Sequence, residues 1–494
     1  MNVLLITADQ WRADCLGAAG HPLVRTPALD RLAADGVRFT RHFTQATPCG
    51  PSRASLHTGL YALNHRSITN GTPLDARHTD LSAEVRRAGY RPVLFGYTDR
   101  SHDPRQLPAD DPRLRTYEGV YDGFEVGVGS DESYAAWRAH LERRTGRAFR
   151  LGELFGGALG EPAPYPAELS ETAFLTDAAL DFLERRDADR PWFLHVSYLK
   201  PHPPFVAPAP YHALYHPDDV PAPVRAADPA REAALHPWLR AKLEKPVGTG
   251  DWWGKPARLD EEEIRRARAV YYGLISEIDA GIGRLVEALQ RRGEYDRTLI
   301  VVTSDHGEML GDHWLLGKSG FFRQAFHVPL IIRDPAAGAT RGGAVNAFTE
   351  HVDLMPTVLG RLGLEIPLQC DGLSLVPFLA GTPVHGWRAA AHYEHDFRDV
   401  ETLAFETRLG LPSDKCQLAV RQGPRFVYVH FNGLEPLCFD LERDPGQFAN
   451  IAADPERAPE VLAQAQAMLT WRMDAAERRL TGCKLTPSGV VGRF

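Results

Sequence analysis

The chain has 494 residues and carries 56 Lys and Arg against 64 Asp and Glu, which gives a formal net charge of −8. That charge excludes a nucleic-acid-binding protein that depends on bulk basicity. Hydrophobic residues make up 44% of the chain, which suffices for large cores and excludes a disordered chain.

The longest apolar runs have only the length of a strand, so we expect no membrane-spanning segment. The chain starts at Met1 and enters an apolar run without the cationic segment of a secretory signal. Its six cysteines form no C-x-x-C pair, a pattern typical of a reduced compartment rather than of a disulfide scaffold or a zinc knuckle. These features predict a cytoplasmic protein.

Short β-branched runs alternate with helical stretches through the first three quarters of the chain. In chain order the predicted elements are strand Val3–Thr7, helix Pro27–Asp35, helix Ala76–Ala88, strand Pro92–Gly96, helix Glu168–Arg186, strand Trp192–Tyr198, helix Asp260–Arg292, strand Thr298–Thr303, strand Val328–Ile332 and helix His351–Leu362. Alternation of this kind predicts an α/β fold, with a large and mainly parallel sheet sandwiched by helices.

The segment from Lys200 to Arg258 contains twelve prolines in 59 residues, together with Trp252 and Trp253. This density of proline excludes a regular helix or a central strand. The segment is therefore either a lid over a site or a surface excursion. We favour the lid, because a loop of this length without a function is uncommon.

After about residue 385 the pattern changes to short alternating runs. They predict strands at Gln417–Arg421, Arg425–Phe431 and Leu437–Asp440 and a helix from Pro455 to Arg479, a small antiparallel sheet with one helix. We therefore expect a catalytic domain over residues 1–384, including the proline-rich segment 200–258, and a C-terminal α+β subdomain over residues 385–494.

Acidic and imidazole side chains directly follow two predicted strands. Asp9 follows the first strand, and Asp305 and His306 follow the strand that ends near residue 303. In open α/β sheets, ligands bind at the carboxyl ends of the strands, so these groups can converge on a divalent cation such as Mn²⁺, Zn²⁺ or Ca²⁺. The alternative is that the two aspartates merely cap turns.

A second Asp-His pair, Asp312 and His313, follows seven residues after the first. It raises the question of a second metal ion. We prefer the simpler interpretation that the pair lies on a solvated turn of helix.

The segment from Cys49 to Gly59 reads CGPSRASLHTG. Its C-x-P-x-R core, extended by Leu56, Thr58 and Gly59, resembles the sulfatase signature, in which the cysteine is oxidised after translation to formylglycine. The resemblance implies a hydrated aldehyde at Cys49, with one hydroxyl as nucleophile and a second that expels the bound oxyanion by C–O cleavage. At the start of a helical turn, Cys49 also faces backbone N–H groups that suit an anionic substrate.

Further motifs resemble the bacterial phosphonate monoester hydrolases of the alkaline phosphatase superfamily. They are Asn64-His65-Arg66 with Asn70, residues 73–78 (PLDARH), residues 201–205 (PHPPF), and residues 304–308 (SDHGE) followed by residues 315–318 (LLGK). The match runs in order from residue 3 to about residue 370. It implies the alkaline phosphatase-like fold and hydrolysis of phosphonate monoesters and phosphodiesters, with promiscuous hydrolysis of sulfate esters.

The resemblance also implies a role for each matching residue. Asp9, Cys49, Asp305 and His306 are the implied ligands of one divalent metal ion, with Mn²⁺ placed first and Ca²⁺ or Zn²⁺ as alternatives. The implied catalytic residues are Cys49 as nucleophile, Arg53 beside it, Lys318 on the substrate oxygens and His202 as proton donor to the leaving group, while Asn70 and Tyr97 complete the oxyanion pocket.

Two positions depart from the family patterns. Gln10 stands where many sulfatases have a second aspartate, and glutamine at this position favours the phosphonate monoester hydrolase branch. Asp99 stands where these hydrolases have a small hydroxyl side chain. Because an anion repels an anionic substrate, either Asp99 points away from the site or substrate choice has shifted toward something cationic.

Three alternatives to this function remain at this stage. The first is a dedicated arylsulfatase or alkyl sulfatase, which uses the same nucleophile. The second is a two-metal phosphatase relative, weakened by cysteine in place of Ser or Thr at the nucleophile position, and the third is a non-catalytic binding protein. The expected partners are a small anionic ester, the formylglycine-generating enzyme and further copies of the chain in a homo-oligomer, with a tetramer as one option.

Overall fold

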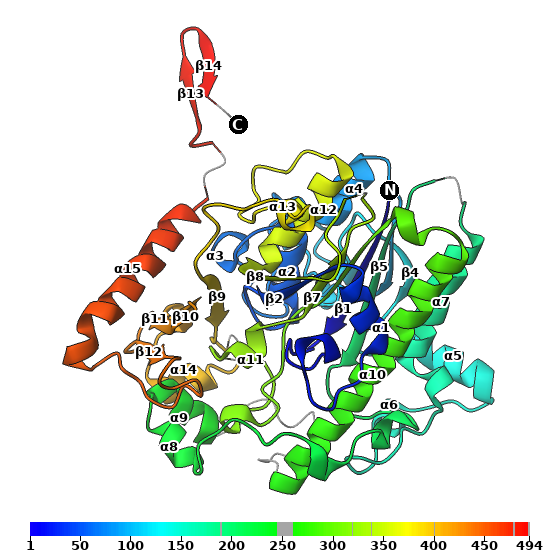
Figure 1. Ribbon diagram of the computed structural model, residues 1–494, viewed down its shortest axis with the longest axis horizontal. Helices are drawn as coiled ribbons and strands as arrows, with labels where there is room; N and C mark the ends of the chain where they lie inside the picture. Colours follow the sequence, from blue (N-terminus) through cyan, green and yellow to red (C-terminus); the bar gives the residue numbers. More distant parts are fainter. Residues whose placement is uncertain are drawn as a thin grey trace.

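The computed structural model describes residues 1–187, 190–244, 260–318, 320–336, 338–399, 401–477 and 480–492. A mixed sheet of eight strands forms its centre (Figure 1). Strand β7 runs antiparallel to both its neighbours, and the other pairs are parallel. In spatial order the strands are β4 (Glu125–Gly129), β3 (Pro92–Gly96), β5 (Phe193–Pro201), β1 (Asn2–Asp9), β6 (Thr298–Ser304), β7 (Leu330–Arg333), β2 (Val37–Phe43) and β8 (Gly343–Glu350).

Helices cover both faces of this sheet, which explains why its central strands β1 and β6 are buried at every position. Successive side chains of β1 alternate between two cores: Leu4 and Ile6 pack on one face, and Val3 and Leu5 on the other. The first face carries α1 (Pro27–Ala34), α7 (Glu171–Arg185) and α10 (Glu261–Arg291). The second carries α2 (Cys49–Thr58), α4 (Leu81–Arg87), α12 (Leu354–Leu362) and α13 (Val376–Leu379).

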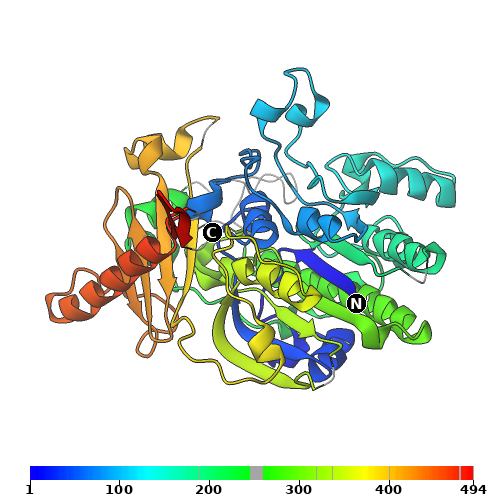
Figure 2. The same ribbon diagram turned by 90° about the horizontal axis from the view of Figure 1, so that it is seen from above.

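A second sheet, of four antiparallel strands, stands at one end of the molecule (Figure 2). Its spatial order is β12 (Leu437–Asp440), β11 (Phe426–Phe431), β10 (Gln417–Gln422) and β9 (Ala391–Asp396). Helix α15 (Ala458–Asp474) packs across its outer face through Met468. Beyond it, the hairpin of β13 (Cys483–Thr486) and β14 (Gly489–Gly492) extends away from the body of the protein (Figure 1).

The predicted fold class is confirmed, and the five predicted strands of the large sheet are confirmed as β1, β3, β5, β6 and β7. Strands β2, β4 and β8 were missed. Their polar and glycine-rich sequences, such as VRFTRHF in β2 and EVGVG in β4, lack a continuous apolar run because they lie toward the edges of the sheet.

Two predicted helix boundaries are wrong. The helix expected from Ala76 begins only at Leu81, because the Asp80 side chain caps it by accepting a hydrogen bond from the Ala83 N–H. The C-terminal helix ends at Asp474 rather than at Arg479, which lies outside the described residues. The long helix α10 is confirmed, with a capping box between Asp260 and Glu263 at its start.

The proline-rich segment packs against the body of the protein, as far as it is described, and its role as a lid or a surface excursion stays a prediction. Residues 205–244 include α8 (Pro229–Ala233) and α9 (Pro237–Glu244), and they pack into the core instead of leaving it. Trp238 and Leu239 are fully buried, because their large apolar surfaces fill the space beside Phe321. Residues 245–258, including Trp252 and Trp253, lie outside the described residues.

The remaining short helices connect these layers. They are α3 (Ala62–His65), α5 (Ala135–Thr145), α6 (Leu151–Leu154), α11 (Arg323–Phe326) and α14 (Ala404–Leu409). Among the described residues, every helix is either too short or too polar to cross a lipid bilayer.

Candidate active site

The predicted site residues gather at the carboxyl ends of the parallel strands. Asp9 is the last residue of β1, and Asp305 with His306 directly follows β6. Tyr97 directly follows β3, and His202 directly follows β5. A register shift between Ala8 and Asp9 pairs Asp9 with Pro201 at the end of β5, which brings the ends of these two strands together.

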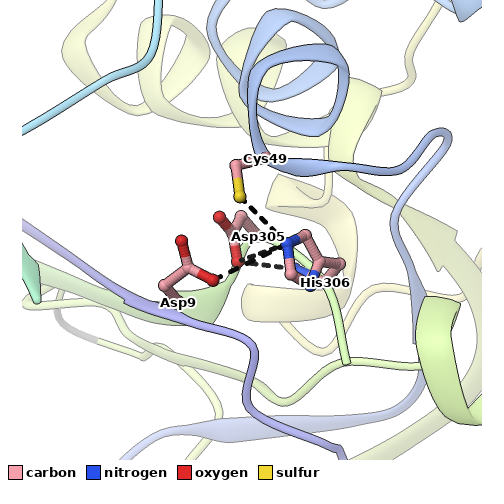
Figure 3. Close-up of side chains that lie close together, drawn as sticks. All are labelled: Asp9, Cys49, Asp305 and His306. Carbon is pink, nitrogen blue, oxygen red and sulfur yellow. Dashed lines mark hydrogen bonds and ion pairs between the residues drawn. The ribbon is translucent and has the colours of Figure 1, made fainter. Parts of the chain in front are cut away.

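Cys49 is the first residue of α2 and points toward these strand ends (Figure 3). The ligand atoms of Asp9, Cys49, Asp305 and His306 all lie within 4.8 Å of one another, and all four residues are buried. His306 Nε2 lies 3.3 Å from Cys49 Sγ, 3.6 Å from Asp9 Oδ1 and 3.8 Å from Asp305 Oδ1. The structure therefore brings together the four predicted ligands.

The chemistry of this cluster fits a divalent cation. His306 Nδ1 lies 3.0 Å from the Gly307 carbonyl oxygen, so Nδ1 carries the proton and the Nε2 lone pair faces the cluster. Burial lowers the pKa of His306, which keeps the ring neutral. Asp9 Oδ1 is buried without a hydrogen-bond partner. A buried carboxylate oxygen beside an imidazole lone pair is costly unless a cation binds there.

Arg53 lies one turn along α2 from Cys49 and holds the aspartates. Its Nε and Nη2 lie 3.0 Å from Asp305 Oδ2, and Nη2 lies 3.7 Å from Asp9 Oδ2. Nη1 donates to the Tyr97 carbonyl at 3.1 Å and to Ser197 Oγ at 2.8 Å. Burial alone would lower the pKa of Arg53, but Tyr97 and these aspartates outweigh it and raise the pKa. Arg53 thus stays charged and sets the orientation of two predicted ligands.

The Cys49 thiol occupies the place where a hydroxyl of formylglycine would stand. Burial and the neighbouring Asp9 raise its pKa well above the usual thiol value. An unmodified thiol here is therefore protonated and a poor nucleophile. On the same first turn of α2, the Gly50 N–H donates to Asn70 Oδ1 at 2.9 Å.

Lys318 lies beside Cys49. Its Nζ is 3.2 Å from Cys49 Sγ, 3.0 Å from Gln10 Oε1 and 2.9 Å from His202 Nε2. Burial would lower the pKa of Lys318, but the adjacent Cys49 and Asp9 raise it, so the side chain is an ammonium. A lysine ammonium only donates hydrogen bonds, so the facing nitrogen of His202 must accept.

His202 is accordingly a neutral imidazole of one defined tautomer. Its Nδ1 donates to the Pro203 carbonyl at 2.6 Å, and Nε2 faces Lys318. Burial and the Lys318 charge lower the pKa of His202 well below the ordinary histidine value. The negative oxygens of a bound ester would raise that pKa again.

Tyr97 and Asn70 both lie at the site, where they contact other residues of the protein. The Tyr97 hydroxyl donates to Asp9 Oδ2, and its ring lies 4.1 Å from the Arg53 guanidinium carbon. This arrangement supports the metal ligands rather than leaving the hydroxyl to a substrate. Asn70 uses its amide oxygen on the Gly50 N–H, which directs its amide nitrogen elsewhere.

Asp99 is buried close to the start of α2. A Cβ built on Gly50 would lie 3.2 Å from the Asp99 carbonyl oxygen, and the carboxyl is among the charges that act on Cys49. Burial raises the pKa of Asp99 to about 7, although Arg53 opposes this shift. Near neutral pH the carboxyl is thus partly protonated, and the expected repulsion of an anionic substrate is weaker than its sequence suggests.

The interpretation of Asp312 and His313 as a solvated turn is wrong. Both residues are buried. Asp312 pairs with Arg12 at 3.0 Å and with Arg268, and His313 Nδ1 lies 2.8 Å from Glu232 Oε2. These ion pairs join α8 and α10 to the loop after β6. Within the described residues, the cluster around Asp9 is the one group with the geometry of a metal site.

Sequence reasoning assigned no role to three further residues at the site. Gln10 bridges Lys318 and Glu308, and Ser197 accepts the hydrogen bond from Arg53. Lys200 donates to the loop that carries His202. Gln10 and Lys200 each lie within two residues of a predicted site residue, and that proximity is the signal that could have identified them.

Comparisons with known proteins show which families the chain resembles. The Sulfatase family model matches residues 1–364, and the model for the C-terminal region of N-sulphoglucosamine sulphohydrolase matches residues 311–475. The chain is 45% identical over 510 residues to the multifunctional alkaline phosphatase superfamily protein PehA of Trinickia caryophylli, covering 100% of this chain and 99% of that protein.

One solved structure and one sulfatase extend the comparison. The phosphonate monoester hydrolase of Agrobacterium radiobacter superposes with a TM-score of 0.96 at 45% identity, covering 100% of this chain and 99% of that one. The choline-sulfatase of Rhizobium meliloti strain 1021 is 30% identical over 463 residues, which is 92% of this chain and 83% of that protein.

Proposed function

We propose that this protein, which belongs to the sulfatase family and hydrolyses ester bonds, acts on phosphonate monoesters and phosphodiesters and promiscuously on sulfate esters. One observation carries the proposal: Cys49 stands at the start of α2 between His306 Nε2 and Lys318 Nζ, at 3.3 and 3.2 Å. An anionic tetrahedral ester needs such an arrangement, with a cationic group, the Lys318 ammonium, and a helix N-terminus around the attacking atom.

The proposed metal ligands are Asp9, Cys49, Asp305 and His306, and the proposed ion is Mn²⁺, with Ca²⁺ and Zn²⁺ as alternatives. Such an ion would supply Lewis-acid stabilisation of the ester oxygens and would lower the pKa of a hydroxyl beside it. Formylglycine made from Cys49 supplies that hydroxyl. The raised pKa of the Cys49 thiol supports this modification, because the unmodified side chain would attack poorly.

The protein's own residues then bind and orient the ester. In this proposal Lys318 presents its ammonium to the non-bridging oxygens, and Asn70 offers them its amide nitrogen. Arg53 and Tyr97 hold the two aspartates in place. In this proposal His202 takes up a proton at Nε2 when the anionic ester binds and passes it to the leaving oxygen, because the bound anion raises the pKa of His202.

The second candidate is a dedicated arylsulfatase or alkyl sulfatase. Asp99 favours it, since the relatives with phosphonate activity that the sequence resembles have a small hydroxyl there. A two-metal phosphatase is less well supported, because the second Asp-His pair is engaged in buried ion pairs. A non-catalytic binding protein is also poorly supported, since it would have no need to hold this many charged groups around one buried thiol.

The deciding experiment compares kcat/KM for a nitrophenyl phosphonate monoester with kcat/KM for nitrophenyl sulfate. Both substrates share one leaving group, so the ratio reports how well the site stabilises each transferred group in the transition state. The preparation must have its conversion of Cys49 measured by mass spectrometry. A ratio well above one supports the proposal, and a ratio well below one makes the protein a sulfatase.

Three further proposals accompany this function. Residues 1–384 are the catalytic domain and residues 385–494 a C-terminal subdomain that contributes to a homo-oligomer. A formylglycine-generating enzyme matures Cys49. The compartment is the cytoplasm, which is consistent with six cysteines that all lack a disulfide partner.

A further inference from the structure

We infer that Lys200 is a positioning residue for His202: its ammonium holds the backbone of residues 202–204 so that His202 Nε2 is aimed at the leaving group. The inference rests on the proposed function, because it assumes that His202 delivers a proton. Lys200 touches neither the proposed metal ligands nor the nucleophile in any contact described above, and it would act only through the loop.

The geometry that carries the inference is a set of three consecutive carbonyl groups. Lys200 Nζ donates to the His202 carbonyl at 3.2 Å and to the Pro204 carbonyl at 3.1 Å. The carbonyl between them, that of Pro203, accepts from His202 Nδ1 at 2.6 Å. Lys200 therefore holds the carbonyl groups of His202 and Pro204. The Pro203 carbonyl, which lies between them, orients the imidazole ring.

This clamp determines which nitrogen of His202 faces the site. While the Pro203 carbonyl holds the proton of Nδ1, Nε2 is directed to Lys318 at 2.9 Å. If the loop rotated, the Pro203 carbonyl would leave the imidazole plane, and both the ring angle and the tautomer would be free to change. A proton donor displaced by about 1 Å loses on the order of 10²-fold in rate.

Burying the ammonium of Lys200 costs free energy, so stability alone does not explain its position. It is only 5% exposed, and burial lowers its pKa to about 8 even though Glu171 and Glu277 oppose that shift. Glu171 and Glu277 act on its charge, and its Nζ lies 5.3 Å from the centroid of the Phe155 ring. An apolar side chain of similar length would avoid the desolvation cost of the ammonium. Such an apolar side chain could not donate the two hydrogen bonds that Lys200 donates to the loop.

The test measures leaving-group dependence, which a purely structural role would not change. Phenol is a much weaker acid than nitrophenol, so a phenyl phosphonate ester needs the proton donor and the nitrophenyl ester scarcely does. We expect Lys200→Met to lower kcat/KM for the phenyl ester by about 10²-fold and that for the nitrophenyl ester only a few-fold. Lys200→Arg, which keeps the charge and the hydrogen-bond donors, should retain most of the wild-type kcat/KM for the phenyl ester.

Two further variants separate this inference from the proposed function. His202→Ala should lower kcat/KM for the phenyl ester by about 10²- to 10⁴-fold, again with little effect on the nitrophenyl ester. The double variant Lys200→Met with His202→Ala should be no slower than His202→Ala alone, because Lys200 acts through His202. Lys242→Met is the matched control: it removes another lysine ammonium held against aromatic rings, those of Trp238 and Phe405, and should leave the leaving-group dependence unchanged.

Each outcome decides between the two proposals. The inference would be overturned if Lys200→Met lowered kcat/KM equally for both esters while His202→Ala lowered it mainly for the phenyl ester. That result would leave the role of His202 intact. Equal losses in His202→Ala would overturn that role and the inference together. Should Lys200→Met not fold, Lys200→Gln, which keeps one donor group, takes its place. A loss of kcat/KM that is confined to the phenyl ester and smaller than that of His202→Ala supports the inference. An equal loss of kcat/KM for both esters overturns it.

Discussion

Cys49 is the residue whose environment argues most directly for chemical modification. Burial and Asp9 raise the pKa of its thiol, and the opposing charge of Lys318 does not offset them. Enzymes that use cysteine itself as a nucleophile lower this pKa instead. The site around Cys49 is suited to a hydroxyl nucleophile next to a cation, and a side chain other than a thiol is therefore expected to react.

We predict that Cys49→Ala abolishes turnover of both ester classes and leaves the fold intact, because the side chain it replaces is small and buried. Activity assays, together with the melting temperature, test this directly. Full activity in Cys49→Ala would refute the assignment of the nucleophile. Mass spectrometry of the wild-type peptide that contains Cys49 tests the modification itself. An unmodified Cys49 thiol in fully active protein would refute the proposed conversion to formylglycine.

Asp99 gives a second prediction at the scale of one residue. Burial raises the pKa of its carboxyl to about 7, well above the usual value of 3.8. The folded state thus favours the protonated form: the stability associated with that form is present below pH 3.8 and is lost as the pH rises through about 7. Above this range the carboxylate is ionised beside the nucleophile and repels an anionic ester.

The expected result is that KM for an anionic ester rises as the pH rises through about 7, and that Asp99→Asn removes this rise. The measurement is a pH profile of KM at constant ionic strength. Asp110→Asn is a suitable control, since Asp110 is an exposed carboxylate in the same connecting segment. A profile that Asp99→Asn leaves unchanged would show that the carboxyl does not face the substrate.

At the scale of elements, the approach of β3 to β5 positions the groups that hold the aspartates. Gly96 ends β3 with a φ of +114°, and a Cβ added there would lie 2.0 Å from the Ser197 carbonyl oxygen. Ser197 binds Arg53 through its hydroxyl, and Tyr97 follows Gly96 directly. Only glycine allows the two strands this close to one another.

Gly96→Ala should therefore destabilise the protein by about 3 kcal/mol, which combines the strained backbone with the steric clash, and should also reduce kcat by displacing Tyr97 and Ser197. Chemical denaturation and steady-state kinetics measure the two effects. Gly89→Ala is the control: its φ of +87° is equally unfavourable, but its Cβ would meet no atom within 4 Å. It should cost about 1 kcal/mol and leave kcat unchanged.

At the scale of the whole molecule, the proposed metal ligands come from segments that are distant in the sequence. Residue 9 ends β1, residues 305 and 306 follow the adjacent strand β6, and Cys49 comes from a helix on one face of the sheet. Without a cation, two buried carboxylates face one another across the site, with Arg53 between them. A bound ion would thus stabilise the packing of β1, β6 and α2 together.

We predict that a strong chelator lowers the melting temperature and that one equivalent of divalent metal restores it. An ion present at 100 times its dissociation constant contributes about 2.7 kcal/mol to the folded state. Differential scanning calorimetry follows the shift, and elemental analysis counts the ions. In His306→Ala the chelator should have little effect. Two ions per chain would instead favour the two-metal phosphatase.

Much of this protein is determined by local sequence. The apolar runs of β1 and β6 and the acidic groups after them predicted both the sheet and the site at its edge, because strand periodicity and strand ends are encoded by neighbouring residues. The C-x-P-x-R segment likewise identified Cys49 and Arg53 before any contact was known. Strands β2, β4 and β8 escaped prediction because they lie at or next to an edge of the sheet, where a strand needs no continuous apolar run.

Only the tertiary structure decided the contacts between distant segments. It placed Asp312 and His313 in buried ion pairs with α8 and α10, and it engaged the Tyr97 hydroxyl with Asp9. It also aimed Lys200 at the loop of His202. The physical reason is that burial, ionisation and tautomer depend on which groups meet across the fold, and a charged residue in a sequence gives no sign of whether it will face water or a partner.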